Sequence, residues 1–101
     1  MPAAYLIVQS QITDPERFKN YMAAAPAAVK ASGGEYLVRG GRMAVLEGQW
    51  QPPRLTVIRY PSLEAAQAMY DSPEYRAARA LRDGATAVFD MVVVEGVDVA
   101  P

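Results

Sequence analysis

The sequence predicts an α+β fold of the ferredoxin-like βαββαβ type, with an antiparallel sheet and the helices on one of its faces. Segments 5–12, 35–39, 55–60 and 88–95 are short and rich in alternating or β-branched apolar residues, which is typical of strands. Two longer segments between them carry apolar residues every three or four positions, which is typical of helices that lie on a sheet. In this order each helix connects two strands by a crossover.

The first helix has clear signals at both ends. Thr13-Asp14-Pro15-Glu16 follows the first strand and provides either a capping box or Asp14 as the N-cap with Pro15 at the first helical position. Gly33-Gly34 marks the end of the helix. Pro26 lies inside it and removes a backbone hydrogen bond, so we expect a kink there or a helix in two pieces.

A hairpin is predicted in the middle of the chain. Residues 35–39 are extended, Gly40-Gly41 permits the positive φ values of a tight turn, and residues 43–47 are expected to return antiparallel. Pro52-Pro53 then forces an extended loop before the strand over 55–60.

The second helix is predicted to be broken. Ser62 caps its start, and Ser72-Pro73-Glu74 begins a further helical segment that runs to Arg82 and stops at Gly84. The last strand, 88–95, is apolar on both sides, which indicates a sheet covered on both faces. Helices cover one face, so a second copy of the sheet is expected on the other, in a homodimer.

Composition limits the possible partners. The 101 residues suit one domain, 1–101, and the net charge of -1 comes from interleaved charges without a basic cluster, which excludes a nucleic-acid footprint. No apolar stretch approaches the roughly 20 residues that cross a bilayer, so we expect no membrane partner. The N-terminus shows no secretory signal, and a cytoplasmic location is the expectation.

Two residue types are missing, and their absence restricts the chemistry. The chain has no cysteine and no histidine, which excludes thiolate nucleophiles, Ser-His-Asp catalysis, His-ligated haem and nearly every catalytic zinc arrangement. We therefore expect neither a metal nor a cofactor. Any chemistry must use Asp, Glu, Tyr, Arg, Lys or Ser.

Several short motifs occur together in the order of a known family. They are Thr13-Asp14-Pro15-Glu16 with Tyr21, Leu37-Val38-Arg39-Gly40-Gly41, Leu46-Glu47-Gly48, Tyr60-Pro61-Ser62, Tyr70-Asp71-Ser72-Pro73-Glu74-Tyr75 and Glu95-Gly96. With them the chain resembles the bacterial domain-of-unknown-function family 1330 (DUF1330). The resemblance implies a dimeric α/β barrel, in which two ferredoxin-like sheets pack face to face beside a cavity. That superfamily includes cofactor-independent monooxygenases, isomerases, haem proteins and binding modules, so it does not select one function.

Arg39, Tyr21 and Tyr70 are the candidate ligand-binding residues. Arg39 ends a predicted strand, where its guanidinium could bind a carboxylate or enolate; the alternative is an ion pair with Glu47 or Glu95. Tyr21 and Tyr70 could donate hydroxyls to a developing oxyanion, and the alternative is that they pack in the core.

Other positions have weaker interpretations. Glu47 and Glu95 would form an acid and base pair if their strands were adjacent, and solvated strand ends are the alternative. Tyr75 has the same two interpretations as Tyr21 and Tyr70, a hydroxyl donor or a core residue. Asp14 is interpreted as a helix cap and not as a general base. Trp50 is expected either over a ligand or, preferably, at the dimer interface.

Three functions stay open. The first is a dimer that binds a small organic acid or an enolisable carbonyl compound, with Arg39 as the anion contact and Tyr21 or Tyr70 as polar supports. The second is a cofactor-independent monooxygenase-like or isomerase-like enzyme in which Tyr70 or Glu95 moves a proton. The third is a structural dimer whose pocket is filled by Met and Tyr side chains.

Overall fold

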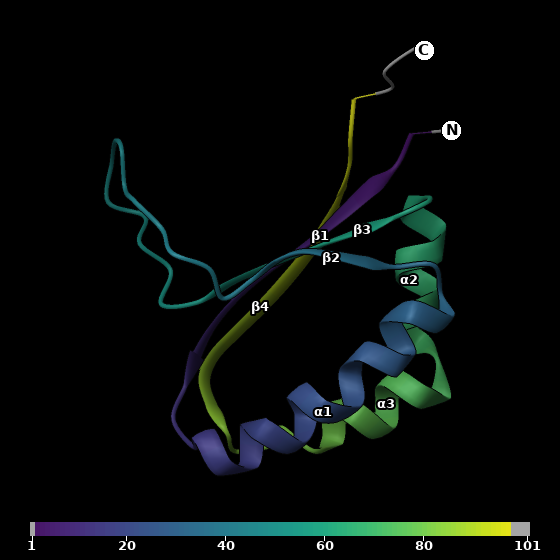
Figure 1. The fold of residues 1–101 in the computed structure, drawn as a ribbon, viewed down its shortest axis with the longest axis horizontal. Coiled ribbons are helices and arrows are strands. Elements are labelled where there is room, and N and C mark those ends of the chain that lie inside the picture. The colour runs from purple at the N-terminus through teal and green to yellow at the C-terminus, as the bar shows by residue number, and fades with distance from the viewer. Residues whose placement is uncertain (1, 98–101) are drawn as a thin grey trace.

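A computed structural model describes residues 2–97 as a four-stranded antiparallel sheet with its helices on one face (Figure 1). The elements are β1 (Ala4–Ile12), α1 (Pro15–Ala31), β2 (Glu35–Arg39), β3 (Leu55–Tyr60), α2 (Leu63–Asp71), α3 (Pro73–Ala80) and β4 (Thr86–Glu95). The strand order β2-β3-β1-β4 confirms the predicted ferredoxin-like plan. None of the helices within 2–97 is long and apolar enough to cross a membrane.

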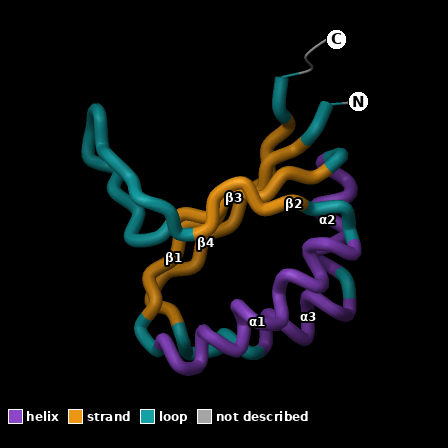
Figure 2. Tube along the Cα trace, in the orientation of Figure 1, coloured by secondary structure: helices purple, strands orange, loops and turns teal. Residues whose placement is uncertain are grey.

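The two faces of the sheet differ in what covers them. On the face toward the helices, Leu6 of β1 pairs with Ile58 of β3 and Val93 of β4, and Leu6 and Ile58 are buried. On the opposite face, Val92 is 59% exposed although its neighbours there are also apolar. Figure 2 shows all three helices on one side of the sheet, so the outer face carries no helix.

Serine and aspartate caps start the helices where the sequence predicts them. Asp14 caps α1 by accepting a hydrogen bond from the backbone N–H of Arg17, and Ser62 caps α2 in the same way. Ser72 caps α3 and separates it from α2, which confirms the predicted break. The last helix ends at Ala80, before the expected limit at Arg82.

The predicted strand over 43–47 and the tight turn before it are wrong. β2 pairs directly with β3, and the N–H of Gly40 donates to the carbonyl of Leu55 at 2.9 Å. β3 thus occupies the place beside β2 that the hairpin prediction assigned to 43–47. Residues 41–53 leave the sheet as a long arm (Figures 1 and 2). Leu46 within this arm is 95% exposed, because no strand pairs with it.

A β-bulge in β2 changes which side chains face the helices. The register against β3 shifts between Tyr36 and Val38, which leaves Leu37 as the extra residue. Simple alternation would put Arg39 on the same face as Glu35, away from the helices. The bulge instead turns Arg39 toward α1.

The α1 helix runs without interruption through Pro26, so the prediction of a helix in two pieces is wrong. Pro26 has no N–H to donate to the carbonyl of Met22, four residues earlier. A guanidinium nitrogen of Arg39, Nη2, donates to that carbonyl at 2.8 Å. A side chain from β2 therefore replaces the hydrogen bond that the proline removes.

Five aromatic residues, termed the aromatic cluster, join the helices to β4. The hydroxyls of Tyr21 on α1 and Tyr75 on α3 are 2.7 Å apart, and Tyr75 is 1% exposed. The ring centroid of Phe89 on β4 lies 6.0 Å from that of Tyr21 in an edge contact. Phe18 and Tyr70 complete the cluster, with centroids 5.3 Å from Tyr21 and 5.7 Å from Tyr75. Such geometry adds to the stabilisation from burial alone.

Removing one hydroxyl of the tyrosine pair should cost more than half of the stability that is lost when both are removed. Tyr21→Phe or Tyr75→Phe leaves the other hydroxyl without its partner, at a cost of about 1 to 3 kcal/mol. The double variant removes both polar groups, so its loss should be clearly smaller than the two single losses added. Urea unfolding of the four proteins measures this coupling. Additive losses would mean that the hydroxyls do not depend on each other.

Candidate functional site

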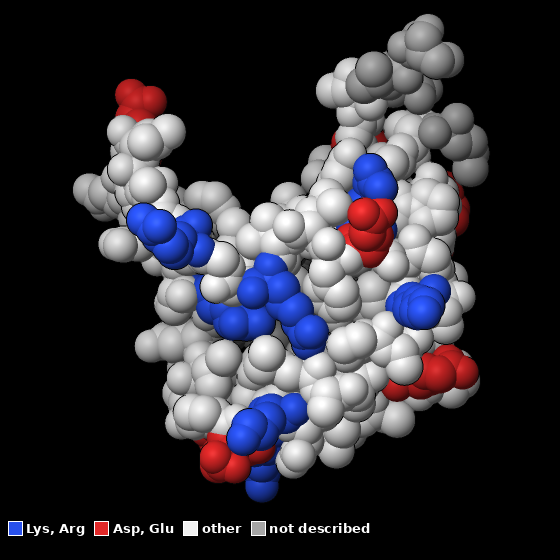
Figure 3. All heavy atoms as spheres, viewed as in Figure 1, with Lys and Arg blue, Asp and Glu red and all other residues white. Residues whose placement is uncertain are grey.

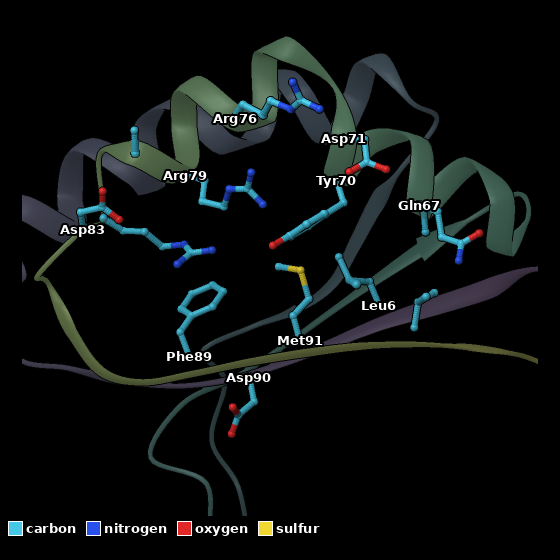
Figure 4. A pocket seen from close by; sticks show the side chains of 14 residues that line it. Leu6, Gln67, Tyr70, Asp71, Arg76, Arg79, Asp83, Phe89, Asp90 and Met91 are labelled. Carbon is cyan, nitrogen blue, oxygen red and sulfur yellow. The ribbon is translucent and has the colours of Figure 1, made fainter.

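A cleft opens between the α2–α3 pair and the edge strand β4. It holds about 1160 Å³, and Figure 4 shows the side chains that line it. The floor is apolar, formed by Phe89 and Met91 of β4 together with Leu6 of β1. Its walls come from the helices, where the guanidinium of Arg79 lies close to the ring of Tyr70 (Figure 4).

Arginines at spacing three are brought to this cleft by α3 and the turn that follows it. Arg76 and Arg79 lie on α3, and Arg82 lies in the turn just after it. The guanidinium carbon of Arg79 is 4.4 Å from the centroid of the Tyr70 ring. That of Arg82 is 3.7 Å from the centroid of Phe89. Both guanidinium groups are therefore held over aromatic faces, as expected for cation–π contacts.

The positive charge of Arg79 and Arg82 has no carboxylate partner at salt-bridge distance. Within residues 2–97 the one salt bridge joins Arg59 to Glu35, outside the cleft. Asp90, although it lines the cleft, points to the other side of β4 and accepts a hydrogen bond from Gln9 (Figure 4). Asp71 and Asp83 also line the cleft, but neither forms a salt bridge with these arginines.

Arg82 carries a buried donor without an acceptor. Its Nε atom is inaccessible to solvent and has no hydrogen-bond partner among the described residues. A buried N–H without a partner costs free energy, so such atoms are rare in native proteins. Arg82 also lines the cleft, so its guanidinium is a candidate donor to an anion bound there.

A second, much smaller space lies between α1 and the middle of the sheet, termed the inner cavity. It holds about 30 Å³, enough for a water molecule or a small group. Three tyrosines and three methionines are among the residues that line it. Leu6, Phe89 and Met91 line both spaces and form the partition between them.

The three predicted ligand residues do not meet in one place. Arg39 and Tyr21 line the inner cavity, whereas Tyr70 lies in the cleft. The hydroxyl of Tyr21 is engaged with Tyr75, and burial raises the pKa of Tyr21 far above its usual value. Tyr21 therefore stays protonated and is unsuited to act as a base.

The predicted carboxylate pair and the predicted ion pair of Arg39 are both wrong. Glu47 lies in the arm beyond β2, and Glu95 ends β4 at the opposite edge of the sheet, so the two strands that were to bring them together are not adjacent. Arg39 forms a salt bridge with neither of them. It bonds the Met22 carbonyl and lies 4.7 Å over the Tyr36 ring.

Trp50 lies outside both the cleft and the inner cavity. It projects from the arm, and its indole N–H donates to the side chain of Gln9 on the outer face of the sheet at 3.2 Å. Within residues 2–97 no group of three or more acidic side chains is placed to hold a metal ion.

The arginines of the cleft were missed by sequence reasoning. They occur in a segment of mixed charge, which is usually a solvated helix face. The available signal was their spacing of three beside two tyrosines, at residues 70 and 75. On one helix that spacing places Arg76 and Arg79 near one another, whereas Tyr70 comes to them from the preceding helix.

Comparison with known proteins supports the fold. Residues 3–97 match the model of a family described as Domain of unknown function (DUF1330). No curated protein is a significant match to the sequence. A solved protein of unknown function from Rhodopseudomonas palustris is 17% identical, with a TM-score of 0.74 over 97% of this chain and 85% of its own.

Two further solved structures have the same architecture. A ferredoxin-like protein of unknown function from Thermobifida fusca, described as dimeric, is 18% identical with a TM-score of 0.64, over 93% of this chain and 91% of that one. SnoaB, a cofactor-independent oxygenase from Streptomyces nogalater, is 9% identical with a TM-score of 0.67, over 100% of this chain and 99% of that one. At these identities the likeness concerns the fold alone.

The buried tyrosines should make the fold sensitive to alkaline pH. Burial raises the pKa of Tyr21 and of Tyr60 in the folded protein, while unfolded tyrosine ionises near pH 10. Above about pH 10 the folded state holds more protons than the unfolded state, so the free energy of unfolding falls as pH rises.

Urea unfolding between pH 8 and pH 11 measures this decline. Tyr21→Phe removes one contribution and should make the decline shallower. Tyr5→Phe, on the outer face of the sheet, is the matched control. If the free energy of unfolding fell equally steeply with pH in the wild type and in Tyr21→Phe, Tyr21 would not contribute to the decline.

Proposed function

This chain belongs to the DUF1330 family, and we propose that it is a homodimer that binds a small organic acid in the cleft. Arg79 and Arg82 are the anion contacts, and Tyr70 forms the wall against which the ligand lies. The observation that carries the proposal is that Arg79 and Arg82 both line the cleft and neither forms a salt bridge within residues 2–97. A carboxylate is the natural acceptor, because the guanidinium fork matches its two oxygens.

The orientation of the arginines supports binding over a merely solvated charge. Arg79 is stacked on Tyr70 and Arg82 on Phe89, so less side-chain freedom remains to be lost when an anion binds. Neither guanidinium is paired in a salt bridge within residues 2–97, so an anion would not have to displace a carboxylate from either of them.

The floor of the cleft indicates the rest of the ligand. Leu6, Phe89, Met91 and Val93 present apolar surface below the arginines. A ligand with a carboxylate at one end and an apolar ring or chain at the other would satisfy both parts. The cleft, at about 1160 Å³, is slightly larger than the roughly 300 to 1000 Å³ of typical small-molecule sites, so it has room for such a ligand.

The outer face of the sheet supports the dimer. Val92 and Val94 of β4 are 59% and 50% exposed, and they lie beside Ile7 and Val57 on a face without helices. An apolar surface of this kind is typical of an interaction site. A second sheet is complementary to it, and the dimeric Thermobifida fusca protein has the same fold.

A second candidate function is cofactor-independent oxygenation or isomerisation of an enolisable substrate in the same cleft. Its support is the shared fold with the oxygenase SnoaB and the position of Tyr70 facing Arg79. Glu95 is exposed and lines neither space, so proton transfer would fall to Tyr70. Oxygen uptake with quinol substrates that is lost in Tyr70→Phe would favour this candidate, whereas unchanged uptake in that variant would reject the role.

Thermal unfolding with a panel of aromatic and aliphatic carboxylic acids tests the binding proposal. A bound acid at about a hundred times its Kd should add roughly 2.7 kcal/mol of stability. That corresponds to a rise in Tm of about 10 °C or more for a domain of this size. Arg79→Gln and Arg82→Gln should each weaken binding about tenfold or more, because each removes a charged hydrogen bond.

The shifts are measured against each variant's own unliganded Tm. Lys19→Gln removes one positive charge from the exposed surface of α1 and is the matched control. An acid that stabilises the arginine variants as strongly as the wild type binds elsewhere. Absence of any stabilising acid in the panel would favour the structural dimer without a ligand.

The dimer has a separate test. Sedimentation or light scattering should give twice the chain mass of 11.0 kDa across micromolar dilution. Val92→Lys should yield monomers, because the interface would then bury an unpaired ammonium group. Ala77→Lys on the exposed side of α3 is the control and should stay dimeric. A wild-type monomer would refute the dimer without affecting the binding proposal.

A further inference from the structure

Another pair of arginines lies at the base of the arm, separate from the cleft. Arg39 ends β2, Arg54 immediately precedes β3, and both line the inner cavity. Neither lines the cleft described above. Their position follows from the β-bulge, which turns Arg39 to the helix side of the sheet.

The backbone at Gly40 allows the second arginine to approach. Gly40 has a φ of +71°, and a Cβ atom there would overlap the guanidinium group of Arg54. Glycine is therefore required both for the turn out of β2 and for the space that the guanidinium occupies. The guanidinium of Arg54 therefore lies against the residue that follows Arg39.

The charges of the two arginines are not balanced by acidic groups. No Asp or Glu is among the residues that line the inner cavity, and neither arginine forms a salt bridge in the described part of the chain. Burial and the charge of Arg39 together lower the pKa of Arg54. In Figure 3, basic atoms gather in the middle of the face below the arm, without acidic atoms beside them.

Neutral polar groups complete the surroundings. Ser10 and Thr56 line the inner cavity with the arginines, and Ser10 is 2% exposed. Only one donor of Arg39 is used by the Met22 carbonyl, out of the five N–H donors that a guanidinium carries. The cavity behind the arginines holds about 30 Å³, which limits the bound group to a small one.

We propose that Arg39 and Arg54 form a second anion site, independent of the cleft, that takes one small oxyanion: a phosphate group or a carboxylate. The anion sits between the two guanidinium groups at the entrance to the inner cavity. It removes the repulsion between two adjacent cations and so stabilises both the base of the arm and the contact of Arg39 with α1.

The probes are inorganic phosphate and succinate, titrated separately at constant ionic strength with sodium chloride as the balancing salt. Calorimetry and the rise in Tm are followed for the full chain. We expect saturable binding of at least one probe to the wild type, weakened tenfold or more in Arg54→Gln. Arg54→Lys, which keeps the charge but removes the planar fork, should also weaken it and guards against misfolding of the first variant.

Variants of the cleft separate the two sites. Arg79→Gln and Arg82→Gln should bind inorganic phosphate as the wild type does, as should the surface control Lys19→Gln. Phosphate alone would identify the ligand as a phosphate group, and succinate alone as a carboxylate. The proposal is overturned if neither probe saturates the wild type, if Arg54→Gln and Arg54→Lys bind unchanged, or if Arg79→Gln abolishes binding instead.

Discussion

The contact between the hydroxyls of Tyr21 and Tyr75 is the interaction around which the helix layer is arranged. It ties α1 to α3 over the sheet, and the aromatic cluster built on it reaches β4 through Phe89. Both the cleft and the inner cavity are bounded by this cluster. Tyr21 and Tyr75 line the inner cavity, while Tyr70 and Phe89 support the arginines that face the cleft. Stability and the geometry of the cleft therefore share one set of side chains.

Local signals predicted most of the fold, and non-local pairing accounts for the failures. Caps at Asp14, Ser62 and Ser72 are contacts within a few residues, so sequence alone located the helix starts and the break between α2 and α3. The strand over 43–47 has the right composition, but β3 takes its place beside β2. A strand forms only where a neighbouring edge is available, and composition contains no information on that edge. The continuity of α1 through Pro26 was not predicted for the same reason, since the compensating donor lies on β2.

The candidate site was less predictable than the fold. Tyr70 was predicted as a ligand residue and does line the cleft, yet Arg39 and Tyr21 lie on the other side of the partition made by Leu6, Phe89 and Met91. An arginine on an amphipathic helix can face solvent or a cleft, and the packing of aromatic rings decides between them. That packing joins segments far apart in the chain. The bulge in β2 likewise reverses the face of Arg39, which strict alternation would assign wrongly.

The replacement of a helical hydrogen bond by Arg39 means that α1 is not self-sufficient. Each interior turn of an ordinary helix is complete as soon as the helix forms. The turn at Pro26 is complete only when β2 has docked and its bulge has turned the guanidinium toward Met22. Formation of the helix and assembly of the sheet edge are thus energetically linked. The arm begins at residue 41, two positions after Arg39, so a movement at the base of the arm would also move the residue whose side chain completes the turn of α1 at Pro26.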